Sequence, residues 1–417
     1  MKFLIFAAKR ELYVYMKKHT TRRRKGSGSK RKLVAIAFKS GDYDYDFGRR
    51  KVHGVIDYYQ KHADWEFVCN EWLQPFVTPA DLPFWNGDGV IGDIYTEDAV
   101  SLFESLSAPF VCTSTSDVGH RFPSVHVDNQ AIGRLAARHL IECKLDRFAF
   151  IGPDGYLYAK ERFIGFSSEV EQAGAKVQPF FTQPPKQALH MPVENIPPDM
   201  LREIIAGLEY PVGIMVSGDR LGFSVLQVCR QLGLRSPEDV AVIGVDNIKM
   251  YCNMSYSSLT SIDPNAHEVG YQASAMLDRL MNGETLEQQH ILIPPQRIVF
   301  RNSTDLTRSE FPEVARALRF IRNHVSEFID VSNVLDVVPV SRRWLEMKFA
   351  DEIGHGVFEE IRRVRMERAK ELLLSTDWTV LQVARGSGFN TVEQLEYNFQ
   401  KLVGMSATQY RKRQASQ

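Results

Sequence analysis

The sequence predicts two doubly wound α/β lobes followed by an all-α domain with two helix-turn-helix motifs. Short β-branched runs alternate with helical patterns from Leu33 to about residue 303, which indicates parallel sheets built from βαβ units. At about 270 residues, this stretch is long for one sheet and favours two lobes. From about residue 312 the strand patterns stop, and two pairs of short helices separated by turns follow.

The charge of the chain is balanced overall and uneven along its length. The 417 residues include 51 Lys or Arg and 51 Asp or Glu. Residues 1–32 carry twelve basic residues and one acidic residue, whereas residues 33–303 carry 22 basic and 34 acidic residues. An acidic middle does not suit contact with phosphates, so any contact with DNA is expected at the ends of the chain.

Residues 1–32 are predicted to be a basic, disordered leader. The apolar run from Phe3 to Ala8 is too short for a secretory signal, and no stretch reaches the roughly 20 residues that cross a membrane. Two interpretations of the leader stay open: an arm that touches DNA phosphates, or a solvated extension. Five cysteines at irregular spacing indicate neither a zinc site nor disulfides, and they favour a reducing cytoplasm.

The strands of the α/β region are expected at short runs rich in β-branched residues. They are residues 33–38, 67–69, 89–92, 109–112, 148–151, 212–216 and 240–245, and the first helix is expected to end near Lys61. Ligands of doubly wound folds bind beyond the carboxyl ends of the strands. No glycine-rich dinucleotide fingerprint and no phosphate loop follows a strand, so no cofactor is expected.

Charged residues near the carboxyl ends of these strands are the candidate ligand contacts: Arg49, Arg162, Asp219 and Asp246. Arg49 lies near the start of the first helix, Arg162 is expected to open a later helix, and each aspartate closely follows a strand. Guanidinium groups donate and carboxylates accept, so together they suit the hydroxyls of a sugar. An aromatic residue is expected to cover the apolar face of the sugar: Tyr45, Phe47 or Trp85. The alternative is that Asp219 and Asp246 only cap helices.

Residues 33–303 resemble the LacI/GalR regulators and the periplasmic sugar-binding proteins. The resemblance rests on Asp128-Asn129, Arg162…Gly165-Phe166, Ser217-Gly218-Asp219 and Val242-Ile243-Gly244-Val245-Asp246. It implies a two-lobed, periplasmic-binding-protein-like fold that holds a monosaccharide between its lobes through Arg162, Asp219 and Asp246. LacI/GalR regulators carry a helix-turn-helix before the sensor, and residues 1–32 do not match one.

The first helix-turn-helix pattern spans residues 331–354. Val331 to Val338 is a short helix, Ser341 caps a second helix from Arg342 to Ile353, and Gly354 closes it. A connecting helix is expected from Phe358 to Leu374. The second helix is expected to contact DNA. Its outward positions are Arg343, Glu346 and Met347, whereas Arg342 and Lys348 are expected to position the DNA backbone, and Ser341 caps the helix.

The second pattern lies about forty-five residues further on. Gly386 and Gly388 tolerate the positive φ that the turn needs, and a helix follows from about Thr391 to Val403. One face of this helix is expected to be buried: Leu395, Phe399 and Leu402. The other face is expected to contact DNA: Thr391, Val392, Glu393, Glu396 and Tyr397.

Residues 312–413 resemble the AraC-type DNA-binding domain. The matching residues are Ser341…Leu345…Phe349…Gly354 in the first unit and Gly388-Phe389…Leu395…Phe399…Gly404 in the second. Met347 and Tyr397 stand where that family usually has arginine. The resemblance implies two recognition helices that enter successive major grooves, roughly 34 Å apart.

The order of the two domains resembles a family of xylose-responsive regulators. The expected domains are a leader (1–32), a sugar sensor (33–303), a linker (304–311) and a DNA-binding domain (312–413). The resemblance implies a homodimeric transcription regulator of the cytoplasm that binds operator DNA and D-xylose, activates genes of pentose catabolism and contacts RNA polymerase. If the linker alone joins the domains, sugar binding must act through the arrangement of two subunits.

Three alternatives to this interpretation exist: a transport receptor, an enzyme and a repressor. A sugar-binding transport receptor has no use for the C-terminal domain. An enzyme is disfavoured because the 11 histidines show no metal-ligand spacing and no nucleophile and base are paired in the sequence. A repressor that responds to a different sugar stays open, because the sequence does not distinguish activation from repression.

Overall fold

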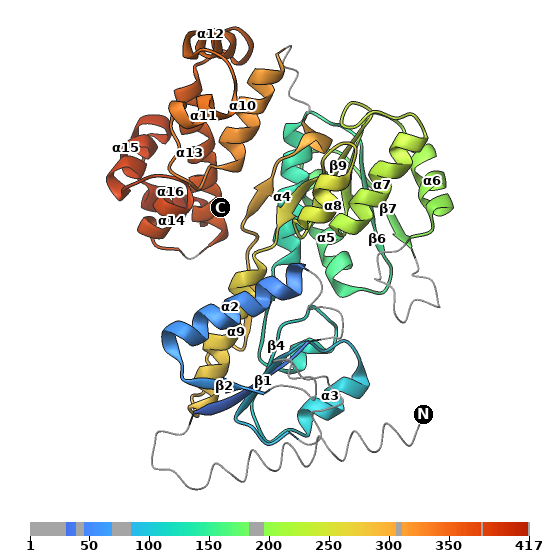
Figure 1. Cartoon of the computed structure of the whole chain (residues 1–417), viewed down its shortest axis with the longest axis vertical. Coiled ribbons are helices and arrows are strands. Elements are labelled where there is room, and N and C mark those ends of the chain that lie inside the picture. The colour runs from blue at the N-terminus through green and yellow to red at the C-terminus, as the bar shows by residue number, and fades with distance from the viewer. Residues whose placement is uncertain are drawn as a thin grey trace. The chain divides into compact units, whose positions relative to one another are not determined.

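Figure 1 shows the computed structural model of the chain. It describes residues 31–38, 46–68, 85–182, 196–305, 311–376 and 378–415. Most of the predicted leader, residues 306–310 of the predicted linker, and Tyr45 lie outside these ranges. Among the described helices, none has the length and apolar character needed to cross a membrane.

The described chain divides into two compact units. The first is built from residues 1–129, 155–161 and 264–295, and the second from residues 130–154, 162–263 and 296–417. Each unit contains one six-stranded sheet, and the second also contains the helical C-terminal region. The two predicted α/β lobes and the all-α region are thereby confirmed.

The sheet of the first unit has the strand order β11-β5-β4-β3-β1-β2, and all neighbouring strands are parallel. One face packs against α3 (Glu97–Glu104), and the core there includes Ala35, Val90, Phe103 and Phe110. The remaining helices are α2 (Asp46–His62), α9 (Ala266–Met281) and the short η2 (Gly119–Arg121). The strands are β1 (Lys32–Ala37), β2 (Trp65–Phe67), β3 (Gly89–Gly92), β4 (Phe110–Cys112), β5 (Ser124–Val127) and β11 (His290–Ile293).

The sheet of the second unit has the order β12-β10-β9-β8-β6-β7. All its pairs are parallel except β10 with β12, which is antiparallel. The strands are β6 (Phe148–Pro153), β7 (Val177–Thr182), β8 (Val212–Val216), β9 (Val240–Val245), β10 (Thr260–Asp263) and β12 (Arg297–Val299).

Helices cover both faces of this second sheet. Successive side chains of a strand point to opposite faces, so the strands contribute to a core on each side. Ile214 and Val216 join one core with α6 (Pro198–Ala206) and α7 (Asp219–Gln231). Phe148 and Phe150 face the other side, where they meet α5 (Leu157–Gln172). The other helices are α4 (Asn129–Glu142), the short α8 (Lys249–Met254) and η3 (Asn302–Thr304).

The described secondary structure elements of the C-terminal region are all helices, joined by short turns (Figure 1). It comprises α10 (Pro312–Asn323), α11 (Val331–Val337), α12 (Arg342–Ile353), α13 (Val357–Ser375), α14 (Val380–Gly386), α15 (Val392–Val403) and α16 (Ala407–Ala415). One core lies around Leu345 and Phe349, and the other lies around Leu395 and Phe399. The long connecting helix α13 contributes to both cores.

Two details of the sequence analysis are wrong. Leu402 is 47% exposed, and Val403 packs against the core instead, because a residue four positions after Phe399 stays on its face of the helix. Arg162 does not open a helix, since α5 already begins at Leu157. Five further strands were not predicted from the sequence, because they are short or half exposed: β5, β7, β10, β11 and β12.

Candidate functional site

Arg162 is held at the carboxyl edge of the second sheet. Its helix crosses α4 closely: a Cβ on Gly133 would lie 2.1 Å from the carbonyl oxygen of Arg162, and a Cβ on Gly165 would lie 2.0 Å from that of Gln130. Arg162 is 5% exposed, and its guanidinium donates to the carbonyl oxygen of Ser217, directly after β8. Glycines at both crossing points therefore allow the approach that places this arginine.

Asp246 lies beside Arg162, where β9 ends. Asp246 Oδ1 is 3.7 Å from a guanidinium nitrogen of Arg162, so the two predicted contacts form an ion pair. The backbone turns sharply here, with φ of 97° at Asp246 and 50° at Asn247. Positive φ is uncommon for residues other than glycine and is tolerated best by Asn and Asp. The turn presents the Asp246 side chain at the edge of the sheet, partly open to solvent.

Asp219 lies deeper than expected, because its carboxylate is fully buried. One oxygen accepts a hydrogen bond from Ser261 Oγ at 2.6 Å. The other accepts from the Ile248 amide at 2.6 Å and from Cys252 Sγ at 3.3 Å. Burial, with a smaller contribution from the charge of Asp246, raises the pKa of Asp219 to about 8. Asp219 thus ties α7 to the segment after β9, and direct contact with a sugar stays a prediction.

The structure places Arg49 on α2 of the first unit, where its side chain is exposed. Its proposed role as a ligand contact stays a prediction. Trp85, one of the three aromatic candidates, is instead part of the core beneath α3 and is only 8% exposed. Phe47 is half buried, with Lys51 Nζ 5.5 Å from its ring centroid.

Two further groups of polar residues at the sheet edges were missed by sequence reasoning. In the second unit, the Arg220 guanidinium lies 5.2 Å from the ring centroid of Tyr251. In the first, the buried Lys51 Nζ bonds both oxygens of Asp93, at 3.0 and 2.9 Å, and Thr113 Oγ1 at 3.2 Å. Asp93 and Thr113 directly follow β3 and β4, and that position was the signal that could have identified them.

The first helix-turn-helix comprises α11 and α12. Ser341 caps α12 by accepting from the Trp344 amide at 3.2 Å, as predicted. Arg342, Arg343 and Met347 are exposed, and Met347 is 49% exposed. Lys348 is half buried, and its ammonium group lies 4.3 Å from the ring centroid of Phe311; its contact with the DNA backbone stays a prediction.

The second helix-turn-helix comprises α14 and α15. Thr391 caps α15 through the Gln394 amide at 3.2 Å, and Gly388 takes the predicted positive φ, 77°. The same prediction is wrong for Gly386, which is the last residue of α14 and has no positive φ. Glu393 is exposed and Tyr397 is 64% exposed, whereas Val392 is partly buried against the core. Glu346 and Glu396 are half buried, and each accepts a hydrogen bond from the helix that follows its own.

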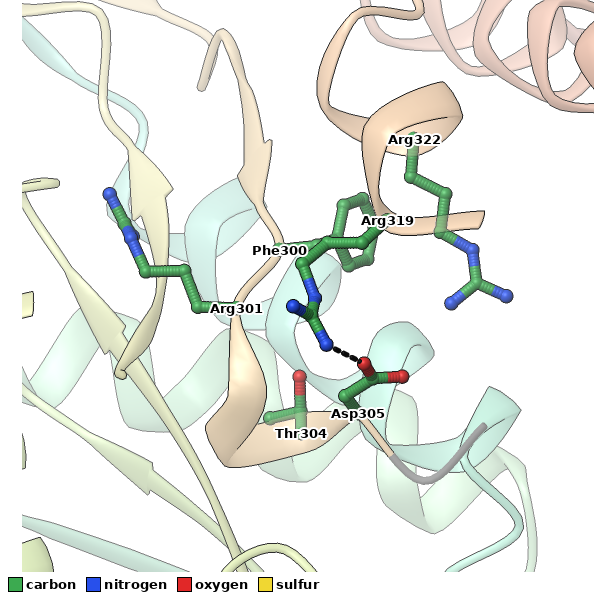
Figure 2. A pocket seen from close by; sticks show the side chains of 6 residues that line it. All are labelled: Phe300, Arg301, Thr304, Asp305, Arg319 and Arg322. Atoms are coloured by element: carbon green, nitrogen blue, oxygen red, sulfur yellow. Dashed lines mark hydrogen bonds and ion pairs between the residues drawn. The ribbon is translucent and has the colours of Figure 1, made fainter. Parts of the chain in front are cut away.

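Within the second unit, the sensor and the DNA-binding region contact each other directly. Asn323, which ends α10, accepts from the Phe300 amide at 2.8 Å and donates to its carbonyl oxygen at 3.0 Å. Arg319 pairs with Asp305, as Figure 2 shows. Side-chain contacts therefore join the two regions in addition to the connecting chain, so the condition of a linker acting alone is not met.

Thr304, the first residue of the predicted linker, is buried together with the end of the sensor. Residues 302–304 form η3, with Ser303 and Thr304 buried. Ser303 Oγ donates to the Val242 carbonyl oxygen at 2.6 Å and accepts from the Thr260 amide at 2.8 Å. Thr304 Oγ1 lies 2.7 Å from His139 Nε2, and burial lowers the pKa of His139 to about 3, so that imidazole stays neutral.

Comparisons with known proteins agree with both halves of this arrangement. Residues 124–304 match the periplasmic binding protein-like domain family, and residues 335–413 match a helix-turn-helix domain family. The xylose operon regulatory protein of Escherichia coli K12 is 30% identical over 399 residues, which cover 92% of this chain and 97% of that protein. The chain belongs to the xylose operon regulatory protein family. The Haemophilus influenzae member is 28% identical over 386 residues, covering 91% of this chain and 97% of its own length.

Solved structures agree with membership of this family. The structure of the xylose-binding transcription activator XylR has a TM-score of 0.55 and 29% identity, covering 92% of this chain and 98% of that one. The structure of a LacI-family regulator from Enterococcus faecium with bound ribose has a TM-score of 0.51 and 22% identity. The match covers 65% of this chain and 98% of that one, and it supports the fold alone. The protein is a transcription regulator with a sugar-binding sensor and an AraC-type DNA-binding domain, and it is not an enzyme.

Proposed function

We propose that the protein is a D-xylose-responsive activator of pentose catabolism genes that acts in the cytoplasm as a homodimer. The observation that carries this proposal is the similarity to the E. coli xylose operon regulatory protein across 92% of the chain, sensor and DNA-binding domain together. Sugar binding changes operator affinity, and the bound protein contacts RNA polymerase.

In the sensor, Arg162 and Asp246 are the proposed contacts to sugar hydroxyls. Their ion pair at the carboxyl edge of the sheet supports this role, because it combines a donor fork with an acceptor at the place where such folds bind ligands. Asp219 holds the turn that carries Asp246, through its bond to the Ile248 amide. Arg49 is a further proposed contact from the first unit.

In the DNA-binding domain, α12 and α15 are the proposed recognition helices. Arg343 and Met347 of α12, with Glu393 and Tyr397 of α15, are exposed and face away from the cores, which supports base contact. Arg342 and Lys348 are proposed to contact phosphates, as are the capped helix N-termini at Ser341 and Thr391.

Three kinds of measurement test the proposal: calorimetry, in vitro transcription and sedimentation. Calorimetry with D-xylose and a panel of other pentoses and hexoses should show the tightest binding for D-xylose. Asp246→Asn retains a residue that tolerates positive φ, and it should weaken binding by about 1.5 to 3 kcal/mol, roughly tenfold to more than a hundredfold. An unchanged dissociation constant would remove Asp246 from the site.

In vitro transcription from the protein's own operator, with RNA polymerase and D-xylose, should then increase with added protein. A decrease in transcription would indicate a repressor. If transcription responded only to a different sugar, that sugar and not D-xylose would be the effector. Sedimentation at increasing concentration tests the proposed dimer.

A further inference from the structure

The two helix-turn-helix units repeat at an offset of 50 residues. Their N-caps are Ser341 and Thr391, and both recognition helices end at a glycine with positive φ, Gly354 and Gly404. Buried positions correspond as well: Leu345 with Leu395, Phe349 with Phe399, and Val357 with Ala407. The offset is larger than the forty-five residues expected from sequence, and it pairs every residue of α12 with one of α15.

Glu346 and Glu396 are equivalent in this repeat and make the same contact. Glu346 Oε2 accepts from the amide of Val357 at 3.1 Å, and Glu396 Oε2 accepts from the amide of Ala407 at 3.0 Å. Val357 and Ala407 are the first residues of α13 and α16. The first amides of a helix have no partner within the helix, and the positive end of its dipole favours a carboxylate.

The contact matters most at α13, because its own N-cap residue is Gly356, which has no side chain to cap with. Glu346 supplies that acceptor from the preceding helix. The approach is tight, since a Cβ on Gly356 would lie 2.7 Å from Glu346 Oε2. At α16 the neighbouring amide of Gln409 is capped by Ser406, so Glu396 adds a second acceptor.

We infer that Glu346 and Glu396 are positioning residues, which fix the helix after each recognition helix and do not read bases. The inference rests on the proposed role of α12 and α15 in DNA recognition. Both carboxylates are half buried and directed at protein amides, whereas Met347 and Tyr397, one residue further along each helix, are exposed. Base reading then falls to Arg343 and Met347 in α12 and to Glu393 and Tyr397 in α15.

Substitution by glutamine separates the two roles, because glutamine keeps an acceptor oxygen and removes the charge. A glutamate that reads cytosine N4 should change its preference toward adenine when it becomes glutamine. A capping glutamate should leave the preferred bases unchanged. Selection from a pool of randomised operators, performed with the full-length protein and D-xylose, measures the preference at every position.

We expect Glu346→Gln and Glu396→Gln to select the same sequences as the parent protein. Glu346→Ala and Glu396→Ala should lower affinity for all sequences alike, by up to about tenfold, the size expected for loss of a helix cap. The matched control is Glu393→Gln, on the exposed face of α15, which should change the preferred base at one position. A changed preference in Glu346→Gln or Glu396→Gln would overturn the inference.

A second measurement does not depend on DNA. Amide hydrogen exchange at Val357 and Ala407 should become faster in the alanine variants, and it should stay near the parent rate in the glutamine variants. Unchanged exchange in the alanine variants would also overturn the inference. If the parent protein selected no sequence at all, the proposed function would fail while the exchange result still tested the caps.

Discussion

The buried Asp219 predicts a measurable dependence of stability on pH. Its pKa is raised from 3.8 to about 8, first by burial and then by the charge of Asp246. Between these values the folded state holds a proton that the unfolded state releases. The free energy of unfolding should therefore fall as pH rises, by about 1.4 kcal/mol per pH unit from this one group. Below pH 4 both states are protonated and the dependence ends.

Asp219→Asn removes the titration and keeps the shape of the side chain. Its amide can still accept from the Ile248 amide and donate to Ser261 Oγ. Relative to the parent protein, the free energy of unfolding of the variant should rise by roughly 2 to 3 kcal/mol between pH 5.5 and pH 7.5. Urea denaturation followed by far-ultraviolet circular dichroism at both values measures this difference. If the free energies of unfolding of the variant and the parent protein changed with pH in parallel, Asp219 would be ionised in the folded protein and the reasoning would be refuted.

Three other substitutions test the packing and the coupling of the domains. Lys51→Met leaves the buried carboxylate of Asp93 without its cation, so the free energy of unfolding from thermal melting should fall by about 3 to 5 kcal/mol. Gly388→Ala should lower the melting temperature of the DNA-binding domain more than Gly404→Ala. Both glycines have φ of 77°, but only a Cβ at position 388 would meet other atoms, 2.3 Å from a carbonyl oxygen. Equal losses of melting temperature in the two variants would contradict this. Asn323→Ala removes both bonds to Phe300, so D-xylose should change operator affinity less than in the parent protein, with calorimetry showing unchanged sugar binding. A full sugar response in that variant would place the coupling elsewhere, such as in the arrangement of two subunits.

The helices of the DNA-binding domain were the part that sequence predicted best. Their limits depend on local signals, namely a capping Ser341, apolar residues at helical spacing and a closing Gly354. These signals act within one or two turns of the chain. Helix α12 was accordingly predicted with the limits that the structure has.

The roles of individual polar residues were harder to predict, because their partners are distant in sequence. The buried Asp219 accepts hydrogen bonds from Ser261 and Cys252, which lie 42 and 33 residues further along the chain. Glu346 reaches an amide 11 residues away, which only the turn after α12 brings back. Residues 302–305 have the polar composition of a linker, yet Ser303 is buried with its hydroxyl fully bonded.

The repeat of 50 residues places unlike side chains at equivalent points of the two recognition helices. Arg343 corresponds to Glu393, so one helix presents a cation where the other presents an anion. If α12 and α15 read bases as proposed, a binding site has two distinguishable ends, because reversing the site would place each side chain against the bases that suit the other. One chain would then bind in a single orientation along the duplex, as a regulator needs if it is to act only on genes on one side of its site.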